Sequence, residues 1–365
     1  MKFAVFSHVA EKETCSPKQR LDEFAAEVRL CDELGYDYFF TTEHHFTGRF
    51  SMAPSQPVSL TVVAQNSERM RFGPMVVLLP ISQPLRVLEE MIILDHMSGG
   101  RLEIGLGRGI TPHEHTSYGI NTHSDVARFN EGLEIMIKGL NAEGPFSFLG
   151  EFWQYIDVDL PWRPLQRPHP PIWIPTNTPA RGYEYGMRGY GIGGFAVVGM
   201  DLYEVVFREY LRGCDEAGIP HDRRPLIYLA STLVAETDAE AKELMYDHFL
   251  RQLALFEDER RRSRRVGDSA IKQATTASLG RMAAIRADMD GSAEGLRFVH
   301  GSPDTVAAKI KHLQERLGVN VFLGEFSFGE LSWDQVQRSH ELFMGEVVPQ
   351  IVGTQVVGTQ VAAAG

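Results

Sequence analysis

Short apolar stretches typical of buried strands alternate along the chain with longer stretches in which apolar residues recur at helical spacing. Eight strands are expected, at residues 2–7, 36–42, 70–79, 102–106, 172–174, 192–198, 226–235 and 320–326. Helices are expected at 16–34, 56–67, 84–98, 125–140, 180–188, 202–217, 239–256, 305–317 and 333–348. The first helix has the clearest signals, because Ser16 and Gln19 form a capping-box pattern, Pro17 suits the first helical position and Gly35 ends the period.

This alternation predicts an α/β fold. Repeated strand–helix units joined by short loops build a parallel sheet, and eight of them favour a closed (β/α)8 TIM barrel. A doubly wound open sheet is the alternative, but the first strand is followed by SHVAEKETC rather than a glycine-rich phosphate turn. Residues 1–351 are therefore expected to form one barrel domain, and 352–365, which repeat VGTQV, a disordered tail.

Two segments depart from the regular pattern and are expected to be insertions. Residues 141–171 contain six prolines and two tryptophans, and we expect an excursion with a short hairpin there. Residues 257–300 are polar, rich in arginine and spotted with glycine, which indicates a mobile insertion. Its run DERRRSRR, at 258–265, favours a solvated helix face over a basic lid across an anionic ligand.

Charge and cysteine content narrow the class of protein. The formal net charge of −12 (36 basic minus 48 acidic residues) argues against nucleic acid as a partner. Cys15, Cys31 and Cys214 are widely spaced without a CxxC pair, so neither a disulfide framework nor a zinc-thiolate site is expected. The longest apolar runs are too short to span a bilayer as helices, and the N-terminus is typical of a strand rather than a secretion signal. These features predict a cytoplasmic protein with no membrane segment.

In such a barrel, the active site lies where the strands end. After the fifth strand, the turn Thr176-Asn177-Thr178-Pro179-Ala180-Arg181 opens a helix, so free N–H groups, hydroxyls and a guanidinium could hold an anion. The alternative is an ordinary helix cap. After the fourth strand, Gly105, Gly107 and Gly109 would let a flat ring or a phosphate approach the backbone, or simply form a tight turn.

Histidines supply the candidate proton-transfer groups. His44 and His45 follow the second strand and, on extended backbone, point to opposite sides, so one of them can face the barrel mouth. A hydrogen-bonded structural role is the alternative. His113-Glu114-His115, with His123 nearby, lacks the ligand spacing of known metal sites, so no metal is expected.

Three long stretches resemble the bacterial luciferase-like flavin-dependent monooxygenases. They are TTEHHF (41–46), VLLPISQPLRVLEEMIILDHMSGGRLEIGLGRG (77–109), and HGSPDTVAAKI (300–310) with LFMGEVVPQI (342–351). The resemblance implies a (β/α)8 barrel with an insertion near the seventh strand that forms a mobile lid. It also implies reduced FMN, delivered by a separate NAD(P)H-dependent flavin reductase. With O2 this FMNH2 gives a C4a-(hydro)peroxyflavin that oxygenates a small, largely apolar organic substrate.

The resemblance also assigns roles to residues of this chain. His44 matches the family's catalytic histidine, which acts as a general acid/base beside the flavin. The cofactor-binding positions that it implies are Met75, Val76, Arg108, Arg128, Thr176, Asn177, Thr178 and Arg181. Met75-Val76 correspond to a bulge or non-proline cis peptide under the flavin ring. Two departures stand out: Gln83 replaces a frequent histidine, and Gly107 stands where some luciferases carry a reactive cysteine.

Two other functions remain open from the sequence. An F420-dependent hydride-transfer enzyme shares this barrel, and non-catalytic flavin-binding relatives exist as well. The His44-His45 pair favours the monooxygenase. Family members usually dimerise through their early helices, so a homodimer is expected.

Overall fold

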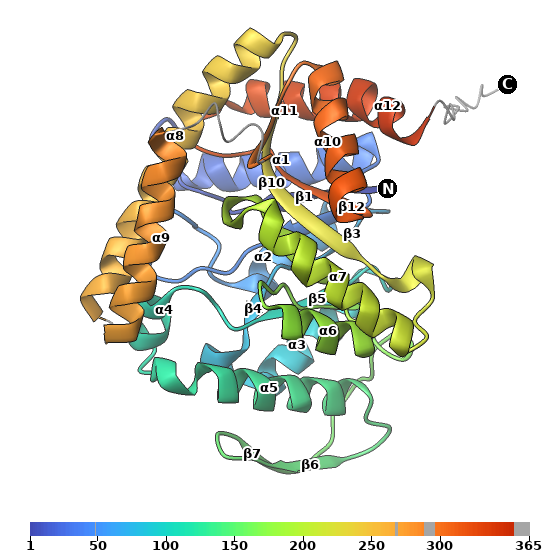
Figure 1. Ribbon diagram of the computed structural model, residues 1–365. Helices are drawn as coiled ribbons and strands as arrows, with labels where there is room; N and C mark the ends of the chain where they lie inside the picture. Colours follow the sequence, from blue (N-terminus) through green and yellow to red (C-terminus); the bar gives the residue numbers. More distant parts are fainter. Residues whose placement is uncertain (48, 267–268, 288–295, 354–365) are drawn as a thin grey trace, which may run out of the picture.

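The computed structural model describes all residues except 48, 267–268, 288–295 and 354–365 (Figure 1). Most of the expected tail, from residue 354 onward, and residues 288–295 of the expected insertion therefore lie outside the described residues. The strands are β1 (Lys2–Ser7), β2 (Tyr38–Thr41), β3 (Arg71–Pro74), β4 (Val77–Leu78), β5 (Ile104–Gly107), β6 (Phe146–Leu149), β7 (Gln154–Val158), β8 (Ile172–Trp173), β9 (Ile192–Phe195), β10 (Leu226–Val234), β11 (Phe298–Gly301) and β12 (Val321–Glu325). The helices are α1 (Pro17–Leu34), α2 (Gln56–Gln65), α3 (Pro84–Met97), α4 (Pro112–Ser117), α5 (Asp125–Leu140), α6 (Pro179–Met187), α7 (Met200–Glu216), α8 (Asp238–Val266), α9 (Ser269–Ala287), α10 (Pro303–Leu317), α11 (Trp333–Leu342) and α12 (Val348–Val352).

The strands form a parallel half-barrel, as expected for an α/β fold. One sheet has the order β11-β10-β12-β1-β2-β3, with β9 also paired to β10, and a second has the order β4-β5-β8. Single parallel bridges join Phe72 to Leu102 and Trp173 to Gly191 between these strands. Every pairing in the two sheets is parallel, so the ends of consecutive strands, and the loops that follow them, lie on one side.

Successive residues of the strands face different cores. On β1, Phe3 and Val5 belong to the cluster beneath the helices, whereas Ala4 and Phe6 pack with Tyr38, Phe40 and Trp173 on the concave side of the sheet. Because both faces are covered, β1 is apolar over nearly its whole length. The continuous apolar runs in the sequence are explained by this double burial.

The expected start of the first helix is confirmed in detail. The side chains of Ser16 and Gln19 cap each other's backbone N–H groups, Pro17 occupies the first turn, and Gly35 ends α1 in the left-handed region with φ of 90°. The hairpin expected within 141–171 is also present, as the antiparallel pair β6 and β7 at the bottom of Figure 1.

Three expected elements need correction. The third strand is divided into β3 and β4, and between them lies a non-proline cis peptide at Met75–Val76, one of the two features that the resemblance implied there. The helix expected to end at Phe256 continues as α8 to Val266, and α9 follows, so much of the expected polar insertion is a helical hairpin. One terminal helix was expected at 333–348, but the structure has three consecutive segments there. They are α11, a π-helical turn over Phe343–Val347, and α12.

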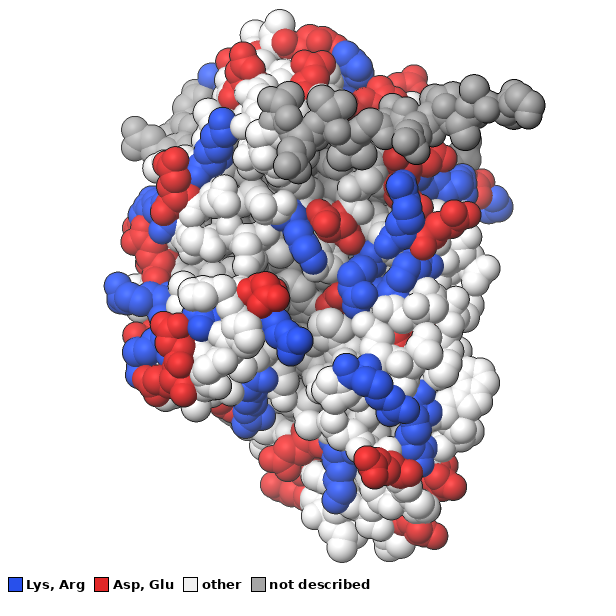
Figure 2. Space-filling model, turned by 90° about the vertical axis from the view of Figure 1, so that its right-hand side faces the viewer, with Lys and Arg blue, Asp and Glu red and all other residues white. Residues whose placement is uncertain are grey.

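The α8–α9 hairpin lies along the left of Figure 1 beside α4, whereas Met1 lies on the right. Because β1 starts near Met1, this places the hairpin at the end of the sheet where the strands finish. The face drawn in Figure 2 carries Lys and Arg interspersed with Asp and Glu, so charges of both signs share it. Within the described ranges, no helix is both long enough and apolar enough to cross a bilayer.

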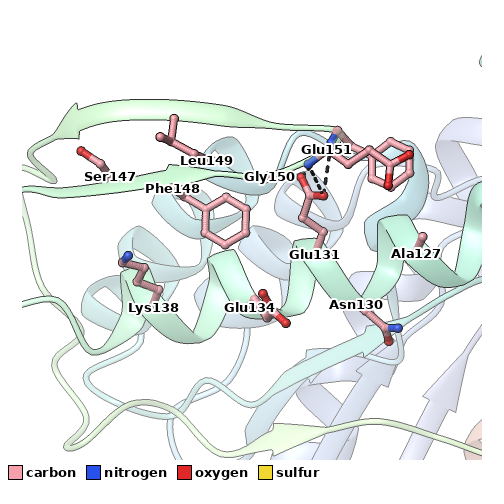
Figure 3. Close-up of a pocket in the computed structure, with 11 residues that line it drawn as sticks. Ala127, Asn130, Glu131, Glu134, Lys138, Ser147, Phe148, Leu149, Gly150 and Glu151 are labelled. Carbon is pink, nitrogen blue, oxygen red and sulfur yellow. Dashed lines mark hydrogen bonds between the residues drawn. The ribbon is translucent and has the colours of Figure 1, made fainter.

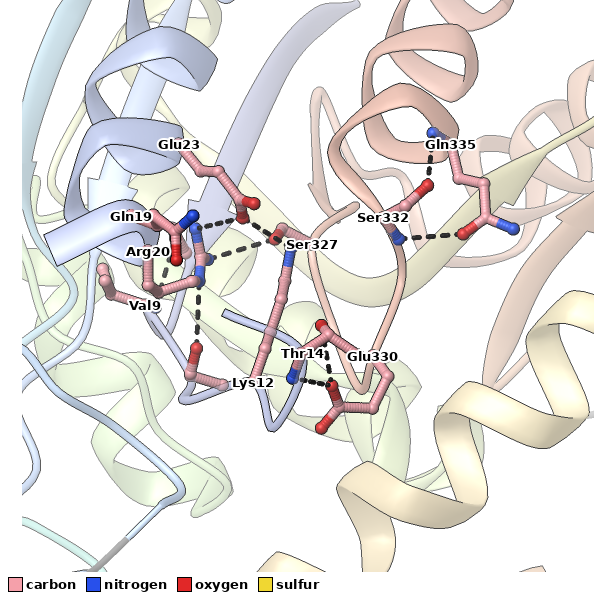
Figure 4. A network of polar contacts seen from close by, with 12 residues as sticks. Val9, Lys12, Thr14, Gln19, Arg20, Glu23, Ser327, Glu330, Ser332 and Gln335 are labelled. Atoms are coloured by element: carbon pink, nitrogen blue, oxygen red, sulfur yellow. Dashed lines mark hydrogen bonds and ion pairs between the residues drawn. The ribbon is translucent and has the colours of Figure 1, made fainter. Parts of the chain in front are cut away.

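The loop after β1 is tied to the loop after β12 by a polar network (Figure 4). Arg20, which is 1% exposed, donates to the carbonyl of Ala10 at 2.9 Å and to Ser327 Oγ at 3.1 Å. Its guanidinium and the ammonium of Lys12 both face Glu23, at 3.7 and 2.7 Å. The network fixes the position of the first strand's loop next to the histidines described below.

Candidate active site

His44 and His45 turn to different partners, as their positions on extended backbone predict. The Nδ1 atom of His44 lies 3.0 Å from Oε1 of Glu114. His45 lies between Glu43, whose Oε1 is 2.8 Å from its Nε2, and Tyr118, whose hydroxyl is 3.0 Å from its Nδ1. Both rings are largely buried, with side chains 11% and 12% exposed.

The short helix α4 explains the His113-Glu114-His115 motif. Glu114 is fully buried and also accepts the backbone N–H of His45 at 2.8 Å. His115 places its Nε2 3.0 Å from the carbonyl oxygen of Arg108. The motif therefore ties the loop after β2 to the loop after β5. Among the described residues, no group of three or more His, Cys, Asp or Glu side chains could hold a metal ion.

The glycines at the end of β5 make room for the cis peptide. A Cβ on Gly107 would lie 2.2 Å from Cγ2 of Val76, and one on Gly105 would lie 2.0 Å from the carbonyl oxygen of Pro74. Only glycine permits this approach of β5 to the junction of β3 and β4. The close approach seen at these glycines is that of the Met75–Val76 segment, and the approach of a flat ring or a phosphate stays a prediction.

Glu43 joins this backbone segment to the histidines. Its Oε2 accepts the N–H of Leu78 at 3.2 Å while its Oε1 faces His45. Burial raises the pKa of Glu43, and the hydrogen bonds from His45 and Leu78 act in the opposite direction. Glu43 therefore links the loop that carries His44 and His45 to the backbone that follows the Met75–Val76 cis peptide.

The helix α8 covers His44. Phe256 contacts Phe50 with ring centroids 4.1 Å apart, and Phe50 lies 4.9 Å from the ring of His44. Farther along α8, the hydroxyl of Ser263 accepts the N–H of His113 at 3.3 Å. The group that these contacts assemble is called the covered cluster below and consists of His8, His44, Phe50, Glu114, Phe256 and Glu259.

His8 was missed by sequence reasoning although it follows the first strand directly. Its ring stacks 5.9 Å from that of His44, and its Nδ1 lies 2.6 Å from Oε1 of Glu325, the last residue of β12. A search of every strand end for titratable residues would have found this pair. Glu259 could not be found, because the helix that carries it was expected to end at Phe256.

The arginine run on α8 largely fits its interpretation as a solvated helix face. Arg261, Arg264 and Arg265 are exposed, and Arg261 and Arg262 pair with acids one turn earlier on the same helix. The opposite side of the helix presents Gln252, Phe256, Glu259 and Ser263 to the protein. α8 therefore turns an aromatic and acidic face, rather than its arginines, toward His44.

The turn after β8 starts α6 without a side-chain cap from Thr178. Thr176 Oγ1 accepts the N–H of Thr178 at 3.2 Å, and Asn177 is exposed. Arg181 pairs with Glu184 at 2.6 Å. The free N–H groups of this helix end are thus still available to a ligand.

Arg108 is exposed and connects this turn to α5. Burial raises the pKa of Tyr185, and the charges of Arg181 and Arg108 lower it, so both guanidinium groups lie within electrostatic range of one hydroxyl. Burial likewise raises the pKa of Asp125, which the charges of Arg108 and Arg128 lower. Arg108 is therefore near both groups.

Arg128 packs against the hairpin instead of standing free. Its guanidinium lies 4.5 Å from the ring of Phe152 and 5.5 Å from that of Trp153, in cation–π geometry. Its buried Nε has no hydrogen-bond partner among the described residues. The structure gives Arg128 a packing role that the sequence did not indicate.

Two surface hollows lie outside the covered cluster. One, of about 390 Å³, is lined by Glu43, His45 and Tyr118 together with the starts of α2 and α3. The other, of about 420 Å³, lies between α5 and the β6–β7 hairpin (Figure 3), where Glu131 accepts the N–H groups of residues 151–153. The second contains none of the expected site residues, so it belongs to the packing of the hairpin.

Two aromatic residues near the strand ends have different surroundings. Phe50 covers His44, whereas Phe326 packs with Tyr36, His340 and Phe343 between α1 and α11.

Comparison with known proteins now adds the family. The model of the family described as luciferase-like monooxygenase matches residues 1–320. The uncharacterized protein y4wF of Sinorhizobium fredii is 39% identical over 49% of this chain and 52% of its own length. The oxygenase component of the flavin-dependent trigonelline monooxygenase of Acinetobacter baylyi is 32% identical over 49% of this chain and 50% of its own length. The chain thus spans about half the length of these relatives.

Solved structures share the fold over nearly the whole chain. The monooxygenase RslO1 of Streptomyces bottropensis superposes with a TM-score of 0.82 at 25% identity, covering 96% of this chain and 99% of its own. The oxygenating constituent of 3,6-diketocamphane monooxygenase of Pseudomonas putida, solved with FMN, gives 0.74 at 24% identity, covering 96% and 98%. An F420-dependent secondary alcohol dehydrogenase gives 0.71 at 17% identity, covering 96% and 98%. At these identities the last two likenesses establish the fold alone.

Proposed function

The chain belongs to the luciferase-like monooxygenase family, and from that premise we propose that it is the oxygenase of a two-component system that uses reduced FMN and O2 to oxygenate a small organic substrate. One observation carries the proposal: His44, held by the buried carboxylate of Glu114, lies beneath α8 in a loop tied to the cis Met75–Val76 segment. A proton-transfer group in a covered site is what oxygen chemistry on a reduced flavin requires.

The residues around this segment suit an FMN. The flavin ring would lie beside the Met75–Val76 segment, which Gly105 and Gly107 allow to pack directly against β5. Thr176, Asn177, Thr178 and Arg181 at the start of α6 would hold the phosphate, with Arg108 contributing positive charge nearby. Arg128 would act indirectly, through Asp125 and the hairpin. Reduced flavin, when bound, supplies the electrons for the reaction with O2.

The chain's own residues then control protons and water. Glu114 holds Nδ1 of His44, which leaves Nε2 to give or take a proton at the reacting group. Phe50 and Phe256 shield that position from solvent, because their rings close over His44. Such shielding prevents stray proton transfer and the wasteful release of hydrogen peroxide.

The proposal includes a separate NAD(P)H-dependent flavin reductase as partner. Its main support is the trigonelline enzyme, which is named as the oxygenase component of a flavin-dependent system. We also propose that the single bridges Phe72–Leu102 and Trp173–Gly191 complete an eight-stranded barrel, that residues 1–351 act as one domain, and that the protein works as a cytoplasmic homodimer.

An F420-dependent hydride transfer is the second candidate. The F420-dependent alcohol dehydrogenase shares the fold, so the architecture accommodates either cofactor. The family is described as luciferase-like monooxygenase, and the trigonelline relative is named as a flavin-dependent monooxygenase. Both descriptions favour FMN and O2 over F420.

Rapid mixing tests the proposal. The protein is loaded with FMNH2 under argon and mixed with aerated buffer, and the absorbance of oxidised flavin is followed. We expect that absorbance to appear later than for free FMNH2, and to appear sooner in His44→Ala. A panel of organic compounds is then screened under ¹⁸O2 for incorporated label. Reoxidation as fast as that of free FMNH2, in protein shown to bind it, argues against the proposal, and reduction of bound F420 by an alcohol would favour the second candidate.

A further inference from the structure

Acidic side chains dominate the polar part of the covered cluster and its surroundings. Glu114, Glu259 and Glu325 are 0%, 3% and 5% exposed. Each lies beneath or on α8: Glu114 holds His44, Glu325 faces His8 and Gln252, and Glu259 is on the helix itself. A carboxylate is rarely buried to this degree unless its charge is compensated.

Among the described residues, the hydrogen bond and the ion pair recorded for Glu259 both come from its own helix. Its Oε1 accepts the hydroxyl of Ser263 at 2.9 Å, and its Oε2 lies 3.6 Å from Nε of Arg260. The guanidinium of Arg260 is engaged elsewhere, because it donates to the carbonyl of Ile110. Ser263, which donates to Glu259, also accepts the N–H of His113 at 3.3 Å, so this carboxyl lies beside the helix that carries Glu114.

Two buried acceptors nearby lack donors. Oε2 of Glu114 and Oε1 of Gln252 have no hydrogen-bond partner among the described residues, and both side chains belong to residues with no measurable exposure. An unpaired buried oxygen is unfavourable, so each is a position that a bound group could satisfy. Both need a donor or a positive charge rather than an anion.

Two phenylalanine rings lie beside these acids and the histidines. Phe50 and Phe256 lie 4.9 Å from His44 and 5.9 Å from His8, respectively. Phenylalanine faces attract organic cations, and carboxylates beside them strengthen that preference. A sulfonate or carboxylate substrate in this position would instead meet three buried acids.

We propose that the covered cluster is the substrate site and that it selects a planar organic cation or a heteroaromatic ring with N–H donors, with Glu259 as the residue that determines this specificity. The ring would displace the contact between Phe50 and Phe256, whose centroids lie 4.1 Å apart, and pack against their faces with its positive edge toward Glu259 and the free oxygen of Glu114. The inference rests on the proposed oxygenase function, because it assigns the substrate class to the same site.

Three probes of similar size test the charge preference: 1-methylpyridinium, toluene and benzoate. Their dissociation constants are measured by saturation-transfer NMR on the full chain with oxidised FMN present. We expect 1-methylpyridinium to bind ~10-fold or more tightly than benzoate, with toluene between them, because the faces of Phe50 and Phe256 and the carboxylates beside them attract a cation and repel an anion. Preference for benzoate, equal binding of all three, or binding of none overturns the proposal.

Matched variants assign the preference to Glu259. Glu259→Gln is expected to weaken 1-methylpyridinium ~10-fold without weakening toluene. Asp258→Asn removes the same charge from the exposed side of α8, where Asp258 pairs with Arg262, and should change neither constant. Equal weakening of every probe in Glu259→Gln would mean a structural role and would overturn the assignment.

Phe256→Leu is a second variant that keeps the proposal testable if Glu259→Gln does not fold. It removes the aromatic face and should weaken the cation more than toluene, whereas equal loss for both contradicts the proposal. The outcome is independent of the oxygenase test. If flavin reoxidation is delayed but the probes show no charge preference, the proposed function stands and the substrate class is rejected. If the probes show the charge preference but reoxidation is rapid, the substrate class stands and the proposed function is rejected.

Discussion

Nδ1 of His44 and the backbone N–H of His45 meet the same oxygen, Oε1 of Glu114, at 3.0 and 2.8 Å. One buried carboxylate therefore fixes both the ring orientation of His44 and the path of the loop that carries it. Since His44 Nδ1 is occupied, the proton chemistry of this ring belongs to Nε2.

Replacing Glu114 by Gln should separate these two roles. The amide oxygen can still accept the N–H of His45, so the fold is kept, but the negative charge that faces His44 is lost. We expect kcat for oxygenation to fall ~10²-fold, in the range that general acid–base catalysis contributes. Steady-state kinetics would check this, with His113→Ala on the same helix as a control that leaves kcat unchanged.

Gly107→Ala should damage the cofactor platform. The added Cβ would lie 2.2 Å from Cγ2 of Val76, so the Val76 side chain or the backbone beside it must shift. We expect a loss of about 1–3 kcal/mol in the free energy of unfolding, as for overpacking in a core, and weaker FMN binding. Gly144→Ala, where nothing lies within 4 Å of the new Cβ, is the matched control. Urea unfolding and fluorescence titration with FMN measure the two effects, and unchanged FMN affinity would separate Gly107 from the cofactor.

The pH dependence of stability should report on Glu259. Burial raises the pKa of this carboxyl above its ordinary value of 4.5, so in the folded state it holds its proton to a higher pH than in the unfolded state. Stability is therefore lost as pH rises from about 4.5 through the raised pKa. Glu259→Gln removes that loss, so its advantage over the wild type should grow between pH 4.5 and 7. Unfolding midpoints in urea at several pH values check this, and Asp258→Asn should show no such trend.

Arg20→Met should be one of the most destabilising single changes available in this chain. The variant removes the donors to Ala10 and Ser327 and leaves Glu23 with Lys12 alone. Breaking a buried ion-pair network typically costs about 3–5 kcal/mol in the free energy of unfolding. Arg86→Met removes an exposed pair with Glu90 and should cost less than about 1 kcal/mol. Comparable losses in both variants, measured by urea unfolding, would contradict the account of the network.

Local signals in the sequence predicted much of the fold. The capping box of Ser16 and Gln19 and the left-handed Gly35 are decided by neighbouring residues, and the structure confirms them. The alternation of strands and helices was equally visible, because parallel strands buried on both faces leave continuous apolar runs.

Other features depend on contacts distant in sequence and could not be predicted. The pairing of Glu114 with His44 spans 70 residues, and that of His8 with Glu325 spans 317. The length of α8 was hidden as well, because its arginines form a polar run while the inward positions Glu259 and Ser263 are themselves polar and buried. Burial of polar residues beside an active site leaves no apolar period to detect.

The strand β10 has a consequence for how this fold can diversify. Its first half pairs with β9 and β12 and its last four residues pair with β11, so the α8–α9 excursion leaves from β10 and returns beside it. Asp238, at the start of α8, is hydrogen-bonded to the segment that follows β11. Its carboxylate accepts the N–H of Ser302 at 2.7 Å and the hydroxyl of Thr305 at 3.0 Å. The two helices between β10 and β11 belong to neither sheet, so a change in their length or sequence need not shift the register of the strands. Variation in this helical hairpin can therefore alter what lies over His44 while the sheet beneath it stays the same.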